Sequence, residues 1–197
     1  MTITSPQLTA EQIMWTSRQP NNLNYLRTNG FLFMIANLPK ISYFCQSANI
    51  PPINLGIATQ STPLLDIKHP GEKLTFGELS IRFKVSEDMS NFMELYTWFV
   101  GLGRPISSQQ FVDYVKSQSF RFPQIAGFTE GPQFSDATLL VMDANNNPVS
   151  QFNFVDLFPT SMTGMDFDIS SGEAITFTCS ATFAFLYYLP TPLLTNA

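Results

Sequence analysis

Few side chains of this 197-residue chain are of types and spacings that could do chemistry. His69 is the sole histidine, which excludes a histidine-based triad and a site with several histidine ligands, and we expect it to be solvated in a turn. Glu87 and Asp88 could form a carboxylate pair, but adjacent acids ahead of a helix more often complement the positive end of its dipole. Asp166 and Asp168 alternate along an expected strand, which permits a weak cation site but favours an acidic surface stripe.

The motifs of common enzymes are also absent from the sequence. There is no glycine-rich phosphate loop and no G-x-S-x-G motif. The two cysteines, Cys45 and Cys179, lack metal-ligand spacing, and we expect both to be reduced thiols inside strands. The sequence therefore predicts a protein that is not an enzyme and that holds no cofactor or metal.

The composition points to large interfaces. Aromatic residues make up 14% of the chain and charged residues only 13%, which is about half of their usual share. The net charge is −5 and no run of Lys and Arg occurs, so tight binding to a nucleic-acid backbone is not expected. No apolar stretch approaches the ~20 residues that span a bilayer, and the start of the chain does not resemble a signal peptide. We expect a protein made in the cytoplasm that stays out of membranes.

The longest regular pattern is a strand over residues 174–188. Apolar residues occupy its odd positions from Ile175 to Tyr187, whereas hydroxyl residues occupy the even positions from Thr176 to Thr182. This period of two predicts a strand with one buried face. At Ala184 the polar face becomes apolar, so we expect the strand to cross the wall of a sandwich or barrel and to be covered at its end.

Other elements follow from shorter patterns. Residues 31–36 are almost all apolar, which predicts a strand buried on both faces, and a second strand is expected over 41–48. Asn91, with Glu94 three residues later, predicts the start of the one strong helix, which should end at Gly101 or Gly103. A shorter helix is expected over 107–115.

Two hairpins are expected. Residues 57–67 and 72–85 form extended arms, and the proline and glycine between them suit a type II turn. We therefore place a charged hairpin tip at Lys68, His69, Pro70, Gly71 and Glu72. Its first arm is too polar to be core, so this hairpin should project. The second hairpin joins 137–143 to 149–155 through asparagines, which tolerate left-handed conformations.

Together these patterns predict a mainly β fold, namely an antiparallel β-sandwich or barrel with one flanking α-helix and projecting hairpins. One β domain over residues 31–189 is expected, with an N-terminal arm over 1–30 and a C-terminal tail over 190–197.

Two parts of this domain resemble the tail tube proteins of contractile-tailed bacteriophages. The run 31–39, followed by Phe44-Cys45-Gln46 and a proline break, is similar to the opening strand pair of that family. Leu157-Phe158-Pro159-Thr160, then an expected short strand over 165–169 and the long strand ending in Tyr187-Tyr188, is similar to its closing strand pair. The resemblance covers most of residues 31–188, whereas the arm and the tail depart from it.

The resemblance implies hexameric rings that stack into a tube through which a phage genome passes. It implies a place in the tail of the virion, assembly in the host cytoplasm, and tail sheath and baseplate proteins as partners. The expected hairpin tip would then contact a neighbouring subunit or ring. Six chains at −5 each give −30 per ring, so the lumen should repel DNA mildly. Three alternatives stay open: a baseplate tube-initiator or terminal cap of the same fold, a separate β-sandwich binding module, and a hydrolase with an unfamiliar carboxylate site.

Overall fold

The computed structural model of the chain describes residues 25–118, 133–167 and 176–193. Over these residues the protein is mainly β, as the sequence predicts. The elements are β1 (Phe31–Ile35), α2 (Pro39–Phe44), β2 (Cys45–Ala48), β3 (Ile53–Gln60), β4 (Ile67–Phe76), β5 (Leu79–Lys84), α3 (Ser90–Gly103), α4 (Gln109–Gln118), β6 (Ser135–Met142), β7 (Pro148–Met162), β8 (Thr178–Ala184) and β9 (Tyr187–Pro192).

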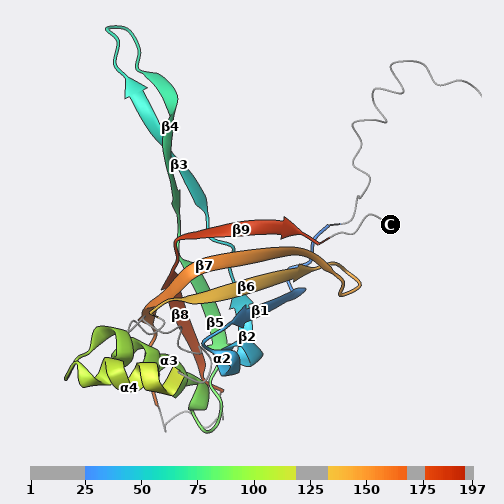
Figure 1. Cartoon of the computed structure of the whole chain (residues 1–197). Coiled ribbons are helices and arrows are strands. Elements are labelled where there is room, and N and C mark those ends of the chain that lie inside the picture. Colours follow the sequence, from blue (N-terminus) through green and yellow to red (C-terminus); the bar gives the residue numbers. More distant parts are fainter. Residues whose placement is uncertain (1–24, 119–132, 168–175, 194–197) are drawn as a thin grey trace, which may run out of the picture.

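Seven antiparallel strands form one open sheet in the order β1-β6-β7-β8-β5-β2, with β9 also paired to β7 (Figure 1). The first part of β7 pairs with β6 and β9, whereas its last part pairs with β8. We call β1, β6, the first part of β7 and β9 half-sheet A, and the last part of β7, β8, β5 and β2 half-sheet B. Within the described residues β1 and β2 end the sheet without pairing to each other, so it does not close into a barrel.

The passage of β7 from one half-sheet to the other occurs at Asp156. Ala137 faces Phe154 and Ser135 faces Leu157, so β7 carries one extra residue at this point, which is a β-bulge. Asp156 has φ 55°, a left-handed conformation that bends the strand, and its N–H lies 3.4 Å from a carboxylate oxygen of Asp136.

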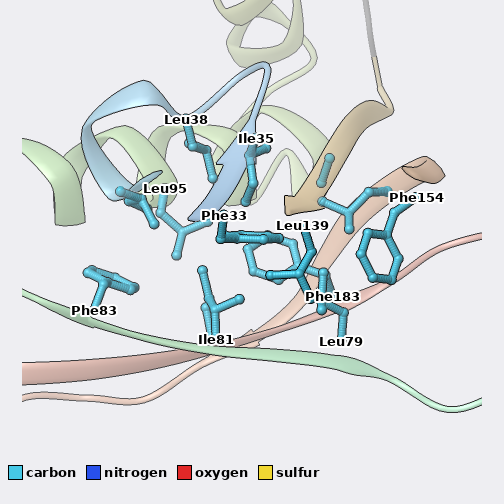
Figure 2. Packing of buried hydrophobic residues seen from close by; sticks show 14 of the residues in the cluster. Phe33, Ile35, Leu38, Leu79, Ile81, Phe83, Leu95, Leu139, Phe154 and Phe183 are labelled. Carbon is cyan, nitrogen blue, oxygen red and sulfur yellow. The ribbon is translucent and has the colours of Figure 1, made fainter. Parts of the chain in front are cut away.

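The core lies between the inner faces of the two half-sheets. Alternate residues of β1, β6, β5 and β8 are buried, as the period of two requires. Figure 2 shows Phe33 and Leu139 of half-sheet A directed towards Ile81 and Phe183 of half-sheet B. Burial of these side chains supplies most of the stabilisation of the fold.

The predicted helix is confirmed as α3, which covers one end of the core. Leu95 and Trp98 are buried, and the Trp98 ring centroid lies 6.3 Å from that of Phe183 on β8. The shorter expected helix is present as α4, and α2 adds a third helix to the described residues, so the expectation of one flanking helix was too low.

Contact between α3 and α4 requires a glycine at position 101. A Cβ atom at Gly101 would lie 2.6 Å from the Tyr114 ring, whereas one at Gly103, on the same helix, would meet nothing within 4 Å. We expect Gly101→Ala to destabilise the protein by about 1–3 kcal/mol through overpacking. Gly103→Ala should be neutral or stabilising by up to about 1 kcal/mol, because alanine favours the helix. Urea unfolding of both variants checks this difference, and equal losses would contradict it.

The start of α3 differs from the expected capping box. The N-cap is Met89, with φ 54°, and Asn91 lies buried in the first turn, where its amide donates to the carbonyl of Lys84 over 2.7 Å. The carboxylate of Asp88 instead accepts the N–H of Ser90 at 3.1 Å and the hydroxyl of Ser86 at 2.6 Å. An acid ahead of the helix thus complements its N-terminus, as expected for this pair of acids.

These hydrogen bonds, first that of the Ser86 hydroxyl, lower the pKa of Asp88 from 3.8 to about 2. A depressed folded-state pKa means that the carboxylate contributes stability above pH 4, and that this contribution disappears as the pH falls from 4 to 2. We therefore expect the stability of Asp88→Asn to depend less on pH than that of the wild type over this range. Thermal unfolding of the two proteins at several pH values measures the effect, and parallel profiles would contradict it.

Several expected strands are corrected. Residues 41–48 are not one strand, because Pro39 begins the short helix α2 and the Ser42 hydroxyl donates back to the Leu38 carbonyl at 3.0 Å. β1 is buried on one face only, and Leu32 and Met34 are exposed on the other. The long last strand is divided into β8 and β9 at residues 185–186, where its face pattern changes.

The second hairpin is confirmed as β6 and β7, with Asn146 left-handed at φ 62° in its turn. Residues 165–167 of the expected short strand are irregular, and 168–169 lie outside the described residues, as do 1–24 of the expected arm. β9 runs across the expected boundary at residue 189 as far as Pro192. The division into arm, domain and tail stays a prediction.

Candidate assembly surfaces

β3 and β4 form a two-stranded antiparallel ribbon that is separate from the main sheet. Figure 1 shows it projecting from the body on the side away from α3 and α4. Every residue of β3 is exposed, and β4 is exposed except at two half-buried positions. The expected projecting hairpin is therefore present.

The tip of this ribbon is not where the Pro-Gly pair placed it. The turn comprises residues 61–66, and Lys68, His69, Pro70, Gly71 and Glu72 all lie within β4. Pro70 is tolerated there because a two-stranded ribbon has open edges that need no N–H donor. His69 is exposed on the strand, with its Nε2 atom 3.3 Å from Oε1 of Gln60.

Gly71 does not lie in a turn, and instead allows two strands to approach each other closely. The register shifts between Leu55 and Ile57, and Gly71 faces Gly56 at this irregularity. A Cβ atom at Gly71 would lie 2.6 Å from the Gly56 carbonyl oxygen, which is too close for any side chain. Substitution of Gly71 would therefore distort the ribbon itself and does not test assembly alone.

The true tip exposes two large apolar side chains. Leu64 is 98% and Leu65 is 73% exposed, and the Leu65 N–H donates to the Thr62 hydroxyl at 3.2 Å, which shapes the turn. Nearer the body, Leu55 faces Leu74 across the two strands, and both are about half exposed. An isolated hairpin buries none of these groups, so the ribbon offers apolar surface to another molecule.

An aromatic anchor fixes the base of the ribbon to the body. It consists of Phe76 at the end of β4 and of Phe152, Phe154, Phe185 and Tyr188 from half-sheet A and the link to it. The ring centroids of Phe76 and Tyr188 are 5.2 Å apart, and the Tyr188 hydroxyl donates to the Pro51 carbonyl at 3.3 Å. The ribbon therefore leaves the body in a defined direction.

The two outer strands of half-sheet A have unlike edges. β9 carries Pro190 and Pro192, which lack N–H donors and so protect an edge against pairing. β1 contains neither proline nor a charged residue. The hydrogen bonds of Gly30 and Ala36 with β6 show that Leu32 and Met34 are the residues of β1 that bond to β6. The N–H and C=O groups of Phe31 and Phe33 therefore point away from β6, to an edge with which no described strand pairs.

The residues considered for chemistry do not form a reactive site. Cys45 and Cys179 are free thiols, and burial raises the pKa of Cys45 to about 11, so it remains protonated. Asp166 is exposed, and Asp168 lies outside the described residues.

The part of the chain that the structure describes contains no group of three or more metal-ligating side chains. Among the same residues, no helix combines the length and the apolar content needed to cross a bilayer.

Sequence reasoning missed the leucine tip, the aromatic anchor and the difference between the two edges. A signal for the tip was available, because Ser61-Thr62-Pro63 is a turn-forming run as strong as Pro70-Gly71. The anchor joins residues far apart in the chain and leaves no local pattern.

The architecture is similar to that of solved components of contractile injection systems. The chain is similar over 90% of its length to 97% of the tube-terminating cap of the anti-feeding prophage, with a TM-score of 0.57 at 15% identity. It matches all of a chain from the extended sheath–tube complex of the PVC extracellular contractile injection system, over 95% of its own length, with a TM-score of 0.56 at 13% identity. The PVC sheath/tube terminator matches with a TM-score of 0.54 at 13% identity, over 86% of this chain and 99% of that one.

At these identities the likeness is one of fold, and that fold is tail-tube-like. No model of a protein family matches the sequence, and no curated protein matches it either.

Proposed function

We propose that this chain is a structural, non-catalytic subunit of the tube of a contractile tail or injection particle. Six copies form a ring, and rings stack into a hollow conduit for a passing genome. Sheath and baseplate proteins are its partners, and its location is the assembled particle, after synthesis and assembly in a host cytoplasm. The fold likeness to a tube-terminating cap and to a sheath–tube complex supports this proposal.

The observation that carries the proposal is the apolar edge of β1, with which no described strand pairs. An edge without proline or charge invites pairing with another strand, and aggregates unless it is covered. β9 is protected by its prolines, so two half-sheets A cannot join β9 to β9 through full ladders. Unlike edges favour head-to-tail contacts, which close into a ring when the rotation between subunits permits it.

The ribbon supplies contacts between rings. It extends away from the core of its own chain, and its tip leucines are almost fully exposed. Burial of a leucine side chain stabilises an interface by about 1.5–3 kcal/mol. In this arrangement Leu64 and Leu65 enter a neighbouring subunit or ring, and Lys68, His69, Pro70, Gly71 and Glu72 line the outer stem beside that contact.

Negative-stain electron microscopy across a concentration series tests the proposal. We expect six-fold rings or hollow tubes above a threshold concentration. Monomers at every concentration, also after addition of baseplate components as a template, would reject the ring-forming role and favour a separate binding module.

A terminator, cap or initiator of the same fold is the second candidate, because a tube-terminating cap and a sheath/tube terminator share the architecture. Such a protein forms single rings, whereas the repeating tube subunit stacks without limit. The length distribution of the particles in the same images separates the two roles.

A further inference from the structure

The outward face of half-sheet B carries hydroxyl and cationic side chains on β5 and β8. On β5 the outward residues are Ser80, Arg82 and Lys84, since Leu79, Ile81 and Phe83 point into the core. On β8 the outward residues are Thr178, Ser180 and Thr182. The register places Arg82 beside Ser180 and Lys84 beside Thr178, so each cation is flanked by a hydroxyl. We call this surface the hydroxyl face.

This face is built to remain in water. The Thr182 hydroxyl lies 2.6 Å from that of Ser161 and 2.9 Å from that of Thr160 on β7, so the hydroxyls hydrogen-bond to one another across strands. None of the exposed large hydrophobic residues in the described part of the chain belongs to β5 or β8. The outward face of half-sheet A exposes Leu32, Met34 and Leu189, which favour a cover, beside the polar side chains of Thr138, Gln151 and Asn153.

The two cations of this face are uncompensated. No side-chain hydrogen bond or ion pair joins Arg82 or Lys84 to another residue that the structure describes. The carboxylates nearest in sequence, Glu78 and Glu87, lie outside the bounds of β5. The charged outward residues of β5 and β8 are therefore these two cations, although the whole chain carries −5.

We propose that the hydroxyl face lines the conduit and makes loose contacts with the phosphate backbone of a nucleic acid; this rests on the proposed function. Arginine, lysine, serine and threonine are the side chains that contact phosphate oxygens without reading sequence. No outward residue of β5 or β8 is aromatic, so these two strands offer no ring on which a base could stack, and contacts along them are independent of sequence. At the β7 end of the face, Phe158 lies opposite Ala184 and beside Phe134. The conduit wall is thus positively charged at this face, whereas the net charge of the chain indicates a negative wall that repels DNA. Two weak contacts per chain guide the polymer without holding it.

Fluorescence anisotropy with labelled oligothymidine, measured from low to physiological salt, tests the contact. The variant Arg82→Gln with Lys84→Gln should bind about tenfold more weakly at low salt. Its salt slope should fall by about one for each phosphate contact removed. The control is Arg27→Gln with Lys40→Gln, which removes one exposed arginine and one exposed lysine elsewhere and gives the same net charge.

Equal losses in both variants would show a pure net-charge effect and overturn the proposal, as would no loss in either. Tighter binding of labelled polyglutamate than of oligothymidine, dependent on Arg82 and Lys84, would assign the face to an acidic protein and also overturn the proposal.

The position of the face in the conduit wall is tested by labelling. A maleimide gold cluster on Ser80→Cys, compared with labelled wild type, should appear on the inside of imaged rings. Gold on the outside would refute the assignment. Binding that depends on Arg82 and Lys84 in a chain that forms no rings would support the phosphate surface and reject the conduit.

Discussion

Replacement of both tip leucines, Leu64→Ser with Leu65→Ser, should abolish ring stacking and leave the monomer folded. Leu64 is almost fully exposed and Leu65 largely exposed in the single chain, so their removal takes nothing from its core. If a neighbouring subunit buries them, about 3–6 kcal/mol is lost at each tip. Since 1.4 kcal/mol corresponds to a factor of ten, the concentration needed for stacking should rise at least about a hundredfold. Sedimentation velocity and electron microscopy measure that threshold.

The matched control is Leu64→Met with Leu65→Met, which keeps the apolar area and should retain stacking. Far-UV circular dichroism of the serine variant should equal that of the wild type. Unchanged stacking by the serine variant would remove the ribbon tip from the assembly contact. Loss of stacking in both variants would point to a contact that depends on leucine shape.

Phe154→Ala should destabilise the protein by about 3–5 kcal/mol, the range for large cavities in a packed core. Phe154 is fully buried, and its ring centroid lies 5.1 Å from that of Phe185 and 5.6 Å from that of Tyr188. The substitution therefore creates a cavity in the core and also loosens the aromatic anchor. Urea unfolding followed by circular dichroism measures the loss.

Phe134→Ala provides the comparison, because Phe134 is about half exposed and pairs with the single ring of Phe158. It should lose about 1 kcal/mol. A loss of similar size in the two variants would mean that the anchor does not hold the core. Partial loss of ring stacking by Phe154→Ala at concentrations where the fold persists would indicate that the anchor sets the direction of the ribbon.

Local sequence patterns predicted those elements that pack against a single neighbouring layer. Cys179 and Phe183 are buried at alternate positions of β8 as the period of two requires. Helix α3 was also predictable. The i, i+3, i+4, i+7 spacing of Phe92, Leu95, Tyr96 and Phe99 predicts an inward face that includes Tyr96, whereas in the structure Trp98 is buried and Tyr96 is about half exposed. Periodicity predicts that a helix is present. The strand against which the helix packs decides which of two adjacent stripes of its side chains is buried.

The hairpin tip could not be located, because glycine has two uses that look alike in sequence. Gly71 follows a proline and fits a type II turn, yet its role is the close approach to Gly56 in a bulge. The opposing strand decides between these uses, and pairing across strands is not a local property. For the same reason Leu32 and Met34 were expected to be buried, since a continuous apolar run does not reveal whether a second layer covers the strand.

The bend at Asp156 determines how the molecule comes apart. Because β7 is one continuous strand that pairs in both half-sheets, unfolding of the whole strand removes a ladder from each of them. Native-state hydrogen exchange should therefore find that buried amides of β6 and of β8 open with the same free energy, in a single cooperative unit. The ribbon, joined to the body only at its base, should exchange far earlier. The ribbon can therefore rearrange while the strands of the main sheet stay paired.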